Sequence, residues 1–437
     1  MSKHIETRRL NVAELRIGMY VTRLETPWSA TEFPLEGVLI KSREDILKIS
    51  RYGKQVEIDQ AKSLSGGQLN LISQIAGSRD SSKKRNQQVG QVRPWRKFCT
   101  QSYSDQRPIS KEIAHAYKLL QRADQLLNEL KPGLKNINAK FVSQISTVSD
   151  EIVASLIESP DALLWLTKVK VRAGKVYDHV VRTSIWATLM GRSMGVQRSS
   201  LSVMNQAILL SSVGKSYLRK NDWLAFQGAE LHPDFAKWSQ LTLEKLSHCR
   251  IEPRVLTIIA NMTERFDGSG FPQQKSGKAI PYLSQVAGLA EAFDLILHPM
   301  LTRKRRTVGQ VLSRLYCYRD SAFDGELIEE LIQATGLYPP GTQVLLSSGC
   351  SGIVVEQSKD RRIRATVALT HDPEGYRLLS YKIIRLGEGD YKDVIIRQEG
   401  SMHKVTEDDL QRINQEIRNY QRSRFAQAFS GLSGIFN

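Results

Sequence analysis

The chain has 437 residues, of which 41% are hydrophobic, and this length excludes a single ordinary domain, so two to four domains with packed cores are expected. Its 62 Lys and Arg against 45 Asp and Glu give a net charge of +17. That surplus favours an anionic partner, whether nucleic acid, a nucleotide, an acidic protein or a membrane face, and does not choose among them.

The four cysteines are too widely spaced for a metal-ligand motif or a disulfide framework, which predicts reduced thiols in a cytoplasmic protein. The first residues, "MSKHIETRRLNV", lack the apolar segment of a secretory signal. No stretch approaches the ~20 apolar residues of a membrane span. The sequence therefore predicts a cytoplasmic protein without a membrane-spanning helix.

In chain order, residues 8–60 predict a small N-terminal α+β domain, with strands within 10–21, 33–42 and 54–59 and a short helix over 42–53. Residues 61–108 are rich in Ser, Gln, Gly and basic residues. This composition predicts a basic flexible linker, and a segment that contacts nucleic acid or a membrane is the alternative.

Residues 109–335 show a helical period and predict a mainly α chain. The first helix covers 110–130 and ends at Pro132-Gly133. Further helices are predicted over 149–168, 176–194, 199–212, 237–247, 253–263, 281–297, 307–318 and 325–335. Residues 336–400 predict a small β module, with strands over 341–348, 351–358, 364–371 and 376–386. Residues 401–437 predict a C-terminal helix, capped by Thr406 with Asp409 three residues on.

The most specific motif is "ERFDGSGFP", residues 264–272, a constrained turn with two glycines closed by Phe-Pro. It follows "YDHVV" at 177–181 and "LLSSVGK" at 209–215. In this order the motifs resemble the HD-GYP family, bacterial phosphodiesterases of cyclic di-GMP, over roughly 160–335. "GMYVTRLETPW" resembles the small domain that often precedes HD-GYP domains, and "YPPGTQVLLSSGCSGIVV" resembles the β segment that often follows them.

The resemblance implies a helical HD-type fold with two or three metal ions, usually iron or manganese, held by imidazoles and carboxylates. The ligand positions are largely degenerate in this chain. The His-Asp pair that names the family falls on Ser211 and Ser212. A later His falls on Trp238, although a gap would place His232 there, and paired histidines fall on Met262 and Thr263. Neutral hydroxyls, an indole and a thioether cannot replace these ligands.

The resemblance also identifies retained family positions, which are His179, Lys215, Glu264, Arg265, Asp267, Gly268, Gly270, Phe271, Pro272, Glu291 and Asp294. His179 is interpreted as a core histidine rather than a ligand. Glu291, at the position of a metal-bridging Asp, is interpreted as a paired or solvated carboxylate. Lys215 faces the substrate phosphate in the family, or in this chain complements a helix dipole. Asp267 and Arg265 are expected to pin the loop by hydrogen bonds.

We therefore expect a catalytically inactive HD-GYP-like protein that acts as a regulatory or binding module in cyclic di-GMP signalling, without a metal or other cofactor. One alternative is an active phosphodiesterase with an atypical metal site. The other is a basic nucleic-acid-binding protein, which the lack of any helix-turn-helix, zinc-finger or aromatic RNA-binding pattern disfavours.

Two partners are predicted for such a module. Lys215 and the basic balance predict residual affinity for cyclic di-GMP. The 267–272 loop, with a largely exposed Phe271, predicts docking of a diguanylate cyclase domain or another signalling protein.

Overall fold

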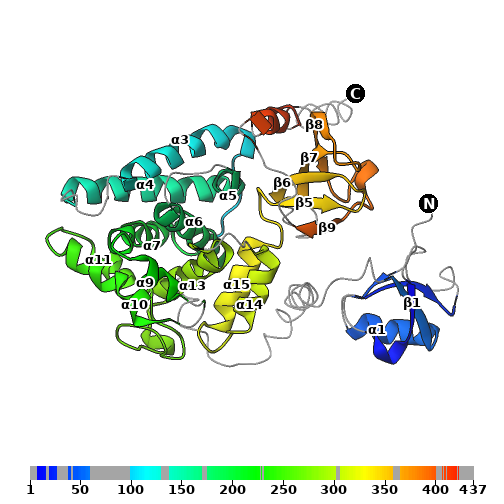
Figure 1. The fold of residues 1–437 in the computed structure, drawn as a ribbon, viewed down its shortest axis with the longest axis horizontal. Coiled ribbons are helices and arrows are strands. Elements are labelled where there is room, and N and C mark those ends of the chain that lie inside the picture. The colour runs from blue at the N-terminus through cyan, green and yellow to red at the C-terminus, as the bar shows by residue number, and fades with distance from the viewer. Residues whose placement is uncertain are drawn as a thin grey trace. The chain divides into compact units, whose positions relative to one another are not determined.

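A computed structural model describes residues 7–15, 19–26, 38–40, 43–59, 99–128, 137–169, 175–226, 228, 231–301, 306–357, 365–399, 406, 408, 409, 411–420 and 422. They form two compact units, one with the residues inside 1–92 and 309–317 and the other with those inside 93–308 and 318–437 (Figure 1). The predicted linker lies outside the described residues up to residue 98, as does the end of the predicted C-terminal helix.

The first unit contains a small antiparallel sheet with the strand order β1-β4-β2-β3. Its strands are β1 (Thr7–Asn11), β2 (Tyr20–Leu24), β3 (Val38–Leu39) and β4 (Gln55–Asp59), with helix α1 (Arg43–Ile49) between the last two. Val21, Ile40, Ile49 and Val56 are buried at its centre. The α+β character predicted for this region is confirmed. The other residues of this unit, 309–317, are Cys317 and all of helix α14 (Val308–Tyr316) except Val308.

The second unit is mainly helical, as the period of the sequence predicted. Its helices are α3 (Ile109–Asn128), α4 (Ala139–Glu158), α5 (Pro160–Val169), α6 (Lys175–Met194), α7 (Arg198–Leu210), α8 (Ser212–Lys215), α9 (Lys220–Leu224), α10 (Pro233–Ala236), α11 (Trp238–Leu246), α12 (Pro253–Asn261), α13 (Tyr282–Leu297) and α15 (Gly325–Thr335). Helix α13 is buried along almost its whole length and packs against α6 (Figure 1). It is apolar on nearly every side, as a central helix must be.

The predicted single helix over 149–168 is wrong, because the structure has two helices there. The first, α4, begins ten residues earlier, where the Asn138 side chain caps it by accepting a hydrogen bond from the amide of Phe141 at 3.0 Å. It ends at Ser159, whose backbone is not helical, and Pro160 begins α5. Proline lacks the amide hydrogen that a continuous helix needs but is suited to a first turn.

The β module is an antiparallel sheet with the strand order β8-β7-β6-β5-β9. Its strands are β5 (Gln343–Leu346), β6 (Ser351–Gln357), β7 (Ala365–His371), β8 (Arg377–Arg385) and β9 (Ile396–Glu399). The first four were predicted and β9 was not. After the sheet, residues 408, 409 and 411–420 are helical. The predicted cap is confirmed, since Asp409 accepts from the Thr406 amide at 2.7 Å and donates its own amide to the Thr406 hydroxyl at 3.2 Å.

A search of the described helices for long apolar segments finds none that could cross a membrane.

Candidate functional site

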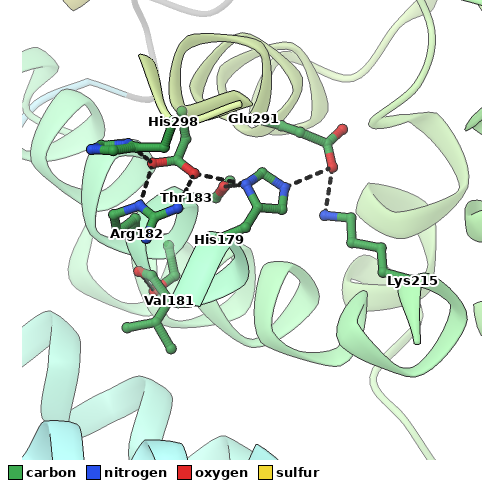
Figure 2. Close-up of polar contacts among 9 residues, drawn as sticks. His179, Val181, Arg182, Thr183, Lys215, Glu291 and His298 are labelled. Carbon is green, nitrogen blue, oxygen red and sulfur yellow. Dashed lines mark hydrogen bonds and ion pairs between the residues drawn. The ribbon is translucent and has the colours of Figure 1, made fainter. Parts of the chain in front are cut away.

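A buried polar cluster joins helices α6 and α13 (Figure 2). His179 and Arg182 lie one turn apart on α6, and Glu291 and Asp294 lie one turn apart on α13. Arg182 donates to both oxygens of Asp294, at 2.7 and 3.1 Å, and His179 Nδ1 lies 2.7 Å from the same carboxylate. His298, the residue that follows α13, places its Nδ1 3.1 Å from the same carboxylate. The carboxylate of Asp294 therefore has partners on α6 and at the end of α13.

These partners decide the charge of Asp294. Burial alone would raise its pKa, because an apolar surrounding disfavours the charged form. The Arg182 charge and the hydrogen bonds from His179 and His298 outweigh burial and hold the pKa of Asp294 well below its ordinary value. Asp294 is therefore an anion at neutral pH, and it ties α13 to α6 through charge-assisted hydrogen bonds.

The second carboxylate of the cluster pairs with a lysine from a third helix. Lys215, at the end of α8, points its ammonium at Glu291, and Nζ lies 2.5 Å from Oε1 (Figure 2). This contact is an ion pair. His179 Nε2 lies 3.7 Å from the same oxygen. Both side chains of the pair are almost fully buried, with exposed fractions of 0% for Lys215 and 2% for Glu291.

Burial and ion pairing have opposite effects on the pKa of Lys215 and on the pKa of Glu291. Burial lowers the pKa of Lys215, although the Glu291 charge works against that change. Burial would raise the pKa of Glu291, but Lys215 and His179 outweigh it and lower that pKa. The pairing predicted for Glu291 and the core position predicted for His179 agree with these contacts. The contact of Lys215 with Glu291 was not predicted.

The positions at which the family resemblance puts lost metal ligands have other contacts in this structure. The hydroxyls of Ser211 and Ser212 are buried and donate to the carbonyls of Ile208 and Leu209 in α7, both at 2.6 Å. These bonds satisfy the hydroxyls locally, as serines in helices often do. Met262 is fully buried.

Trp238 rather than His232 lies in the site. The indole of Trp238 is fully buried, and Lys215 Nζ lies 4.4 Å from the centre of its ring, a cation–π distance. His232 is exposed and caps α10, where its Nδ1 accepts from the amide of Asp234 at 3.2 Å. The alternative assignment of His232 to the ligand position is therefore not supported by its place in the fold.

Aromatic rings pack beside the cluster. Trp223 meets the His179 ring edge to face at 6.1 Å, and Phe235 meets Trp223 at 5.7 Å. Phe235 is fully buried and Trp223 is 8% exposed. Lys215 therefore lies under packed side chains, and the phosphate contact predicted for it is wrong for this conformation, because no surface of Lys215 is accessible.

The residues at this site do not fit the metal ions that the family resemblance implies. A divalent cation needs several anionic or imidazole ligands, and the ammonium of Lys215 already lies against Glu291. Among the described residues, no group of three or more His, Cys, Asp and Glu side chains is arranged to hold a metal. Asp294, which is a ligand by its chemistry, has both oxygens engaged by Arg182 and two histidines.

The 264–272 loop is held by its own side chains. Glu264 accepts from the amides of Gln273 and Lys275 at 2.8 and 3.0 Å, and Asp267 accepts from the Ser269 amide at 2.9 Å. The hydroxyl of Thr263 donates to the Phe271 carbonyl at 2.8 Å, and the Phe271 amide returns a bond to Thr263 at 3.0 Å. Thr263, which was predicted to stand at the position of a lost ligand, thus closes the loop.

The loop also depends on its glycines and on a buried arginine. A Cβ on Gly270 would lie 2.3 Å from the amide nitrogen of Arg265, and Gly268 has a φ of +85°. Arg265 is 1% exposed and lies 4.8 Å from the Phe323 ring centre. Beside it is a cavity of about 10 Å³, room for about one water molecule.

The two residues that end the motif differ in exposure. Phe271 is partly buried and Pro272 is exposed, so the prediction of a largely exposed Phe271 is wrong. Reciprocal backbone bonds with Thr263 hold Phe271 against the loop base.

Two residues of the cluster were missed in the sequence. Arg182 lies three residues after His179, and His298 lies four residues after Asp294. Both spacings are those at which side chains meet along a helix, so they were a sequence signal for these contacts.

Comparison with known proteins gives two family matches. Residues 7–136 match the model of a domain of unknown function, DUF3391, and residues 164–327 match that of an HD domain. The chain is 24% identical over 395 residues to the cyclic di-GMP phosphodiesterase PA4108 of Pseudomonas aeruginosa, covering 89% of this chain and 91% of that protein.

Two shorter matches are to other phosphodiesterases. The chain is 23% identical over 181 residues to the cyclic di-GMP phosphodiesterase response regulator RpfG of Xanthomonas campestris, covering 38% of this chain and 45% of the relative. It is 23% identical over 206 residues to the 3'3'-cGAMP-specific phosphodiesterase 2 of Vibrio cholerae, covering 46% and 38%. Among solved structures, Bd1817, an HDG"Y"P protein from Bdellovibrio bacteriovorus, matches with a TM-score of 0.42 and 13% identity, over 75% of this chain and 98% of that one.

Proposed function

Because the chain belongs to the HD-domain proteins, with a DUF3391 domain before its HD domain, we propose that it acts in bacterial cyclic di-GMP signalling as a catalytically inactive regulatory module. Two of its relatives are cyclic di-GMP phosphodiesterases by name, and a third is named as a 3'3'-cGAMP-specific phosphodiesterase. We place the protein in the cytoplasm, where a signalling module of this kind would meet its partners.

One observation carries the proposal of inactivity. The ammonium of Lys215 lies against Glu291 at 2.5 Å, at the position where the family resemblance puts a metal-bridging carboxylate. Ser211 and Ser212 donate their neutral hydroxyls to carbonyls of α7, and they offer no charge to an ion. Without a bound metal, neither an activated hydroxide nor charge neutralisation at the phosphoryl oxygens is supplied.

The test of inactivity uses the full chain. Elemental analysis is expected to find no stoichiometric iron, manganese or zinc. Hydrolysis of cyclic di-GMP is expected to be absent, with and without added Mn²⁺. Metal-dependent turnover that disappears in a His179→Ala, Glu291→Ala double variant would contradict the proposal and favour an active phosphodiesterase with an atypical metal site.

We also propose that the module acts through a protein partner, a diguanylate cyclase domain or another signalling protein, that contacts the 267–272 loop. The loop is held in one shape by bonds from Glu264 and Thr263, which reduces the ordering cost of binding. The exposed Pro272 and the partly exposed Phe271 offer an apolar contact at its end.

Binding of cyclic di-GMP itself is a separate part of this proposal. The net charge of +17 supports attraction of an anionic dinucleotide, but the burial of Lys215 requires that another surface provides the contact. Calorimetry with cyclic di-GMP tests this, and the absence of heat at saturating ligand would remove the nucleotide from the proposal.

A further inference from the structure

We infer that the ammonium of Lys215 is a built-in structural cation, which does for the carboxylate of Glu291 what a metal ion would do and makes the HD core independent of metal. This goes beyond the proposed regulatory function, and it holds or fails whichever partner the protein has.

Glu291 needs a cation beside it. Its side chain is buried on α13, where an unpaired carboxylate would strongly destabilise the folded chain. Its Oε1 lies 3.7 Å from His179 Nε2 and 2.5 Å from Lys215 Nζ. Lys215 is the nearer of these partners and carries a full positive charge, so it supplies the main compensation for the buried anion.

The fold holds the ammonium of Lys215 in place through a close contact between two helices. Helix α8 crosses α11 at Gly214, where a Cβ would lie 2.1 Å from the Trp238 carbonyl oxygen. Thr242 bridges the crossing, since its hydroxyl accepts from the Gly214 amide at 3.1 Å and donates to the Trp238 carbonyl at 2.7 Å. This close approach brings Lys215 over the Trp238 ring, 4.4 Å from its centre.

The replacement at position 238 is therefore part of the same arrangement. An imidazole there would be a metal ligand, whereas an indole offers an aromatic face to an ammonium, and cation–π attraction is strongest for Trp and for desolvated pairs. The indole and the ammonium are both fully buried. One substitution thus removes a ligand and supplies a contact for the lysine.

The charges of the buried cluster balance one another. The cluster has two anions, Glu291 and Asp294, and two cations, Lys215 and Arg182. Its formal charge is zero with neutral histidines. A divalent ion added beside Lys215 would give a buried excess of two positive charges, which an apolar surrounding opposes strongly. The ammonium and a metal are thus alternatives at this site.

The test compares the thermal unfolding of four full-length proteins, followed by far-UV circular dichroism. They are the wild type, Lys215→Met, the double variant Lys215→Met with Glu291→Leu, and the control Lys245→Met. Lys245 also lies over an aromatic ring, at 5.6 Å from the Tyr217 centre, and pairs with Glu244, but its side chain is 37% exposed. The control therefore removes a comparable lysine contact at the surface.

The wild type is expected to unfold at the same temperature with excess EDTA and with Mn²⁺. Lys215→Met is expected to lower the midpoint by about 10 °C, because it leaves a buried carboxylate unpaired. Lys245→Met is expected to shift it by no more than about 2 °C. The double variant, which removes both charges, is expected to recover most of the loss.

Three results would overturn the inference. They are a fall in the wild-type midpoint with EDTA, equal small losses in the two lysine variants, and a double variant as unstable as Lys215→Met. If Lys215→Met does not fold, a folded double variant still supports the charge pairing, and an unfolded double variant refutes it. Turnover is not measured in these experiments, so their failure is distinct from that of the proposed function.

Discussion

Replacement of Asp294 by Asn tests how strongly the buried cluster holds α6 to α13. The change keeps the size of the side chain but removes its charge and turns one acceptor oxygen into a donor. In the structure, that carboxylate is fully buried and accepts from Arg182 at 2.7 and 3.1 Å. It also lies 2.7 Å from His179 Nδ1 and 3.1 Å from His298 Nδ1. Asn can satisfy only part of this set and leaves the arginine without its counter-ion.

The magnitude follows from the burial of this pair. Removing one partner of a buried ion pair costs about 3–5 kcal/mol of unfolding free energy. For a helical unit of this size, each kcal/mol shifts the melting temperature by roughly 2–4 °C, so the expected fall is roughly 6–20 °C. Thermal unfolding followed by circular dichroism measures it.

Glu151→Gln is the matched control. Glu151 on α4 accepts two bonds from Arg122 on α3, at 2.7 and 3.0 Å, and this pair is 33% and 51% exposed. An exposed pair contributes only about 0–1 kcal/mol, so the control is expected to lose no more than about 4 °C. Equal losses in the two variants would refute the view that burial gives the Asp294 contacts their strength.

The effect of Asp294→Asn on stability is also predicted to depend on pH. The pKa of Asp294 is held well below its ordinary value of 3.8 in the folded chain, since Arg182 and the histidines outweigh burial. A depressed carboxylate pKa contributes stability that is present above the unfolded pKa and is lost as pH falls toward the folded pKa. The difference in stability between wild type and Asp294→Asn should be constant near neutral pH and shrink below about pH 4. A difference that does not shrink in acid would show that its source is packing rather than charge.

Two further predictions concern the helix crossing and the loop. Gly214→Ala places a Cβ 2.1 Å from the Trp238 carbonyl oxygen. It is expected to lower the free energy of unfolding by about 1–3 kcal/mol or more, measured with denaturant. The control is Gly309→Ala, whose Cβ would have open space around it, and it should be neutral or slightly stabilising. Equal stability of the two variants would show that α8 and α11 can separate freely. Phe271→Asp is expected to abolish pull-down of a cyclase partner and, because Phe271 is partly buried, to lower the melting temperature slightly. Gln273→Asp on the exposed end of the loop serves as its control, and a large loss of stability in Phe271→Asp alone would assign Phe271 to the core and remove the docking proposal.

Most of the longer helices, four of the five strands of the β module and the HD-type motifs could be predicted from the sequence because each depends on local patterns. Apolar spacing of 3.6 residues marks a helix face, and alternation marks a strand, whatever the chain packs against. The cap at Thr406 and Asp409 depends on four consecutive residues and was also predictable. The helix break at Pro160 was also marked locally by the proline, but the apolar period continues across it and predicted one helix.

The sequence by itself predicted poor metal ligands at Ser211, Ser212 and Trp238, because a hydroxyl carries no charge and an indole cannot ligate. Only the tertiary structure decided which cation lies beside Glu291. Lys215 and Glu291 are 76 positions apart in number, and their ion pair depends on how closely α8 approaches α11 and how α13 packs on α6. Such contacts between distant segments are set by packing and burial, and a linear pattern does not encode where a flexible ammonium finds its partner. The partial burial of Phe271 was decided in the same way, by the bonds that Thr263 makes across the loop.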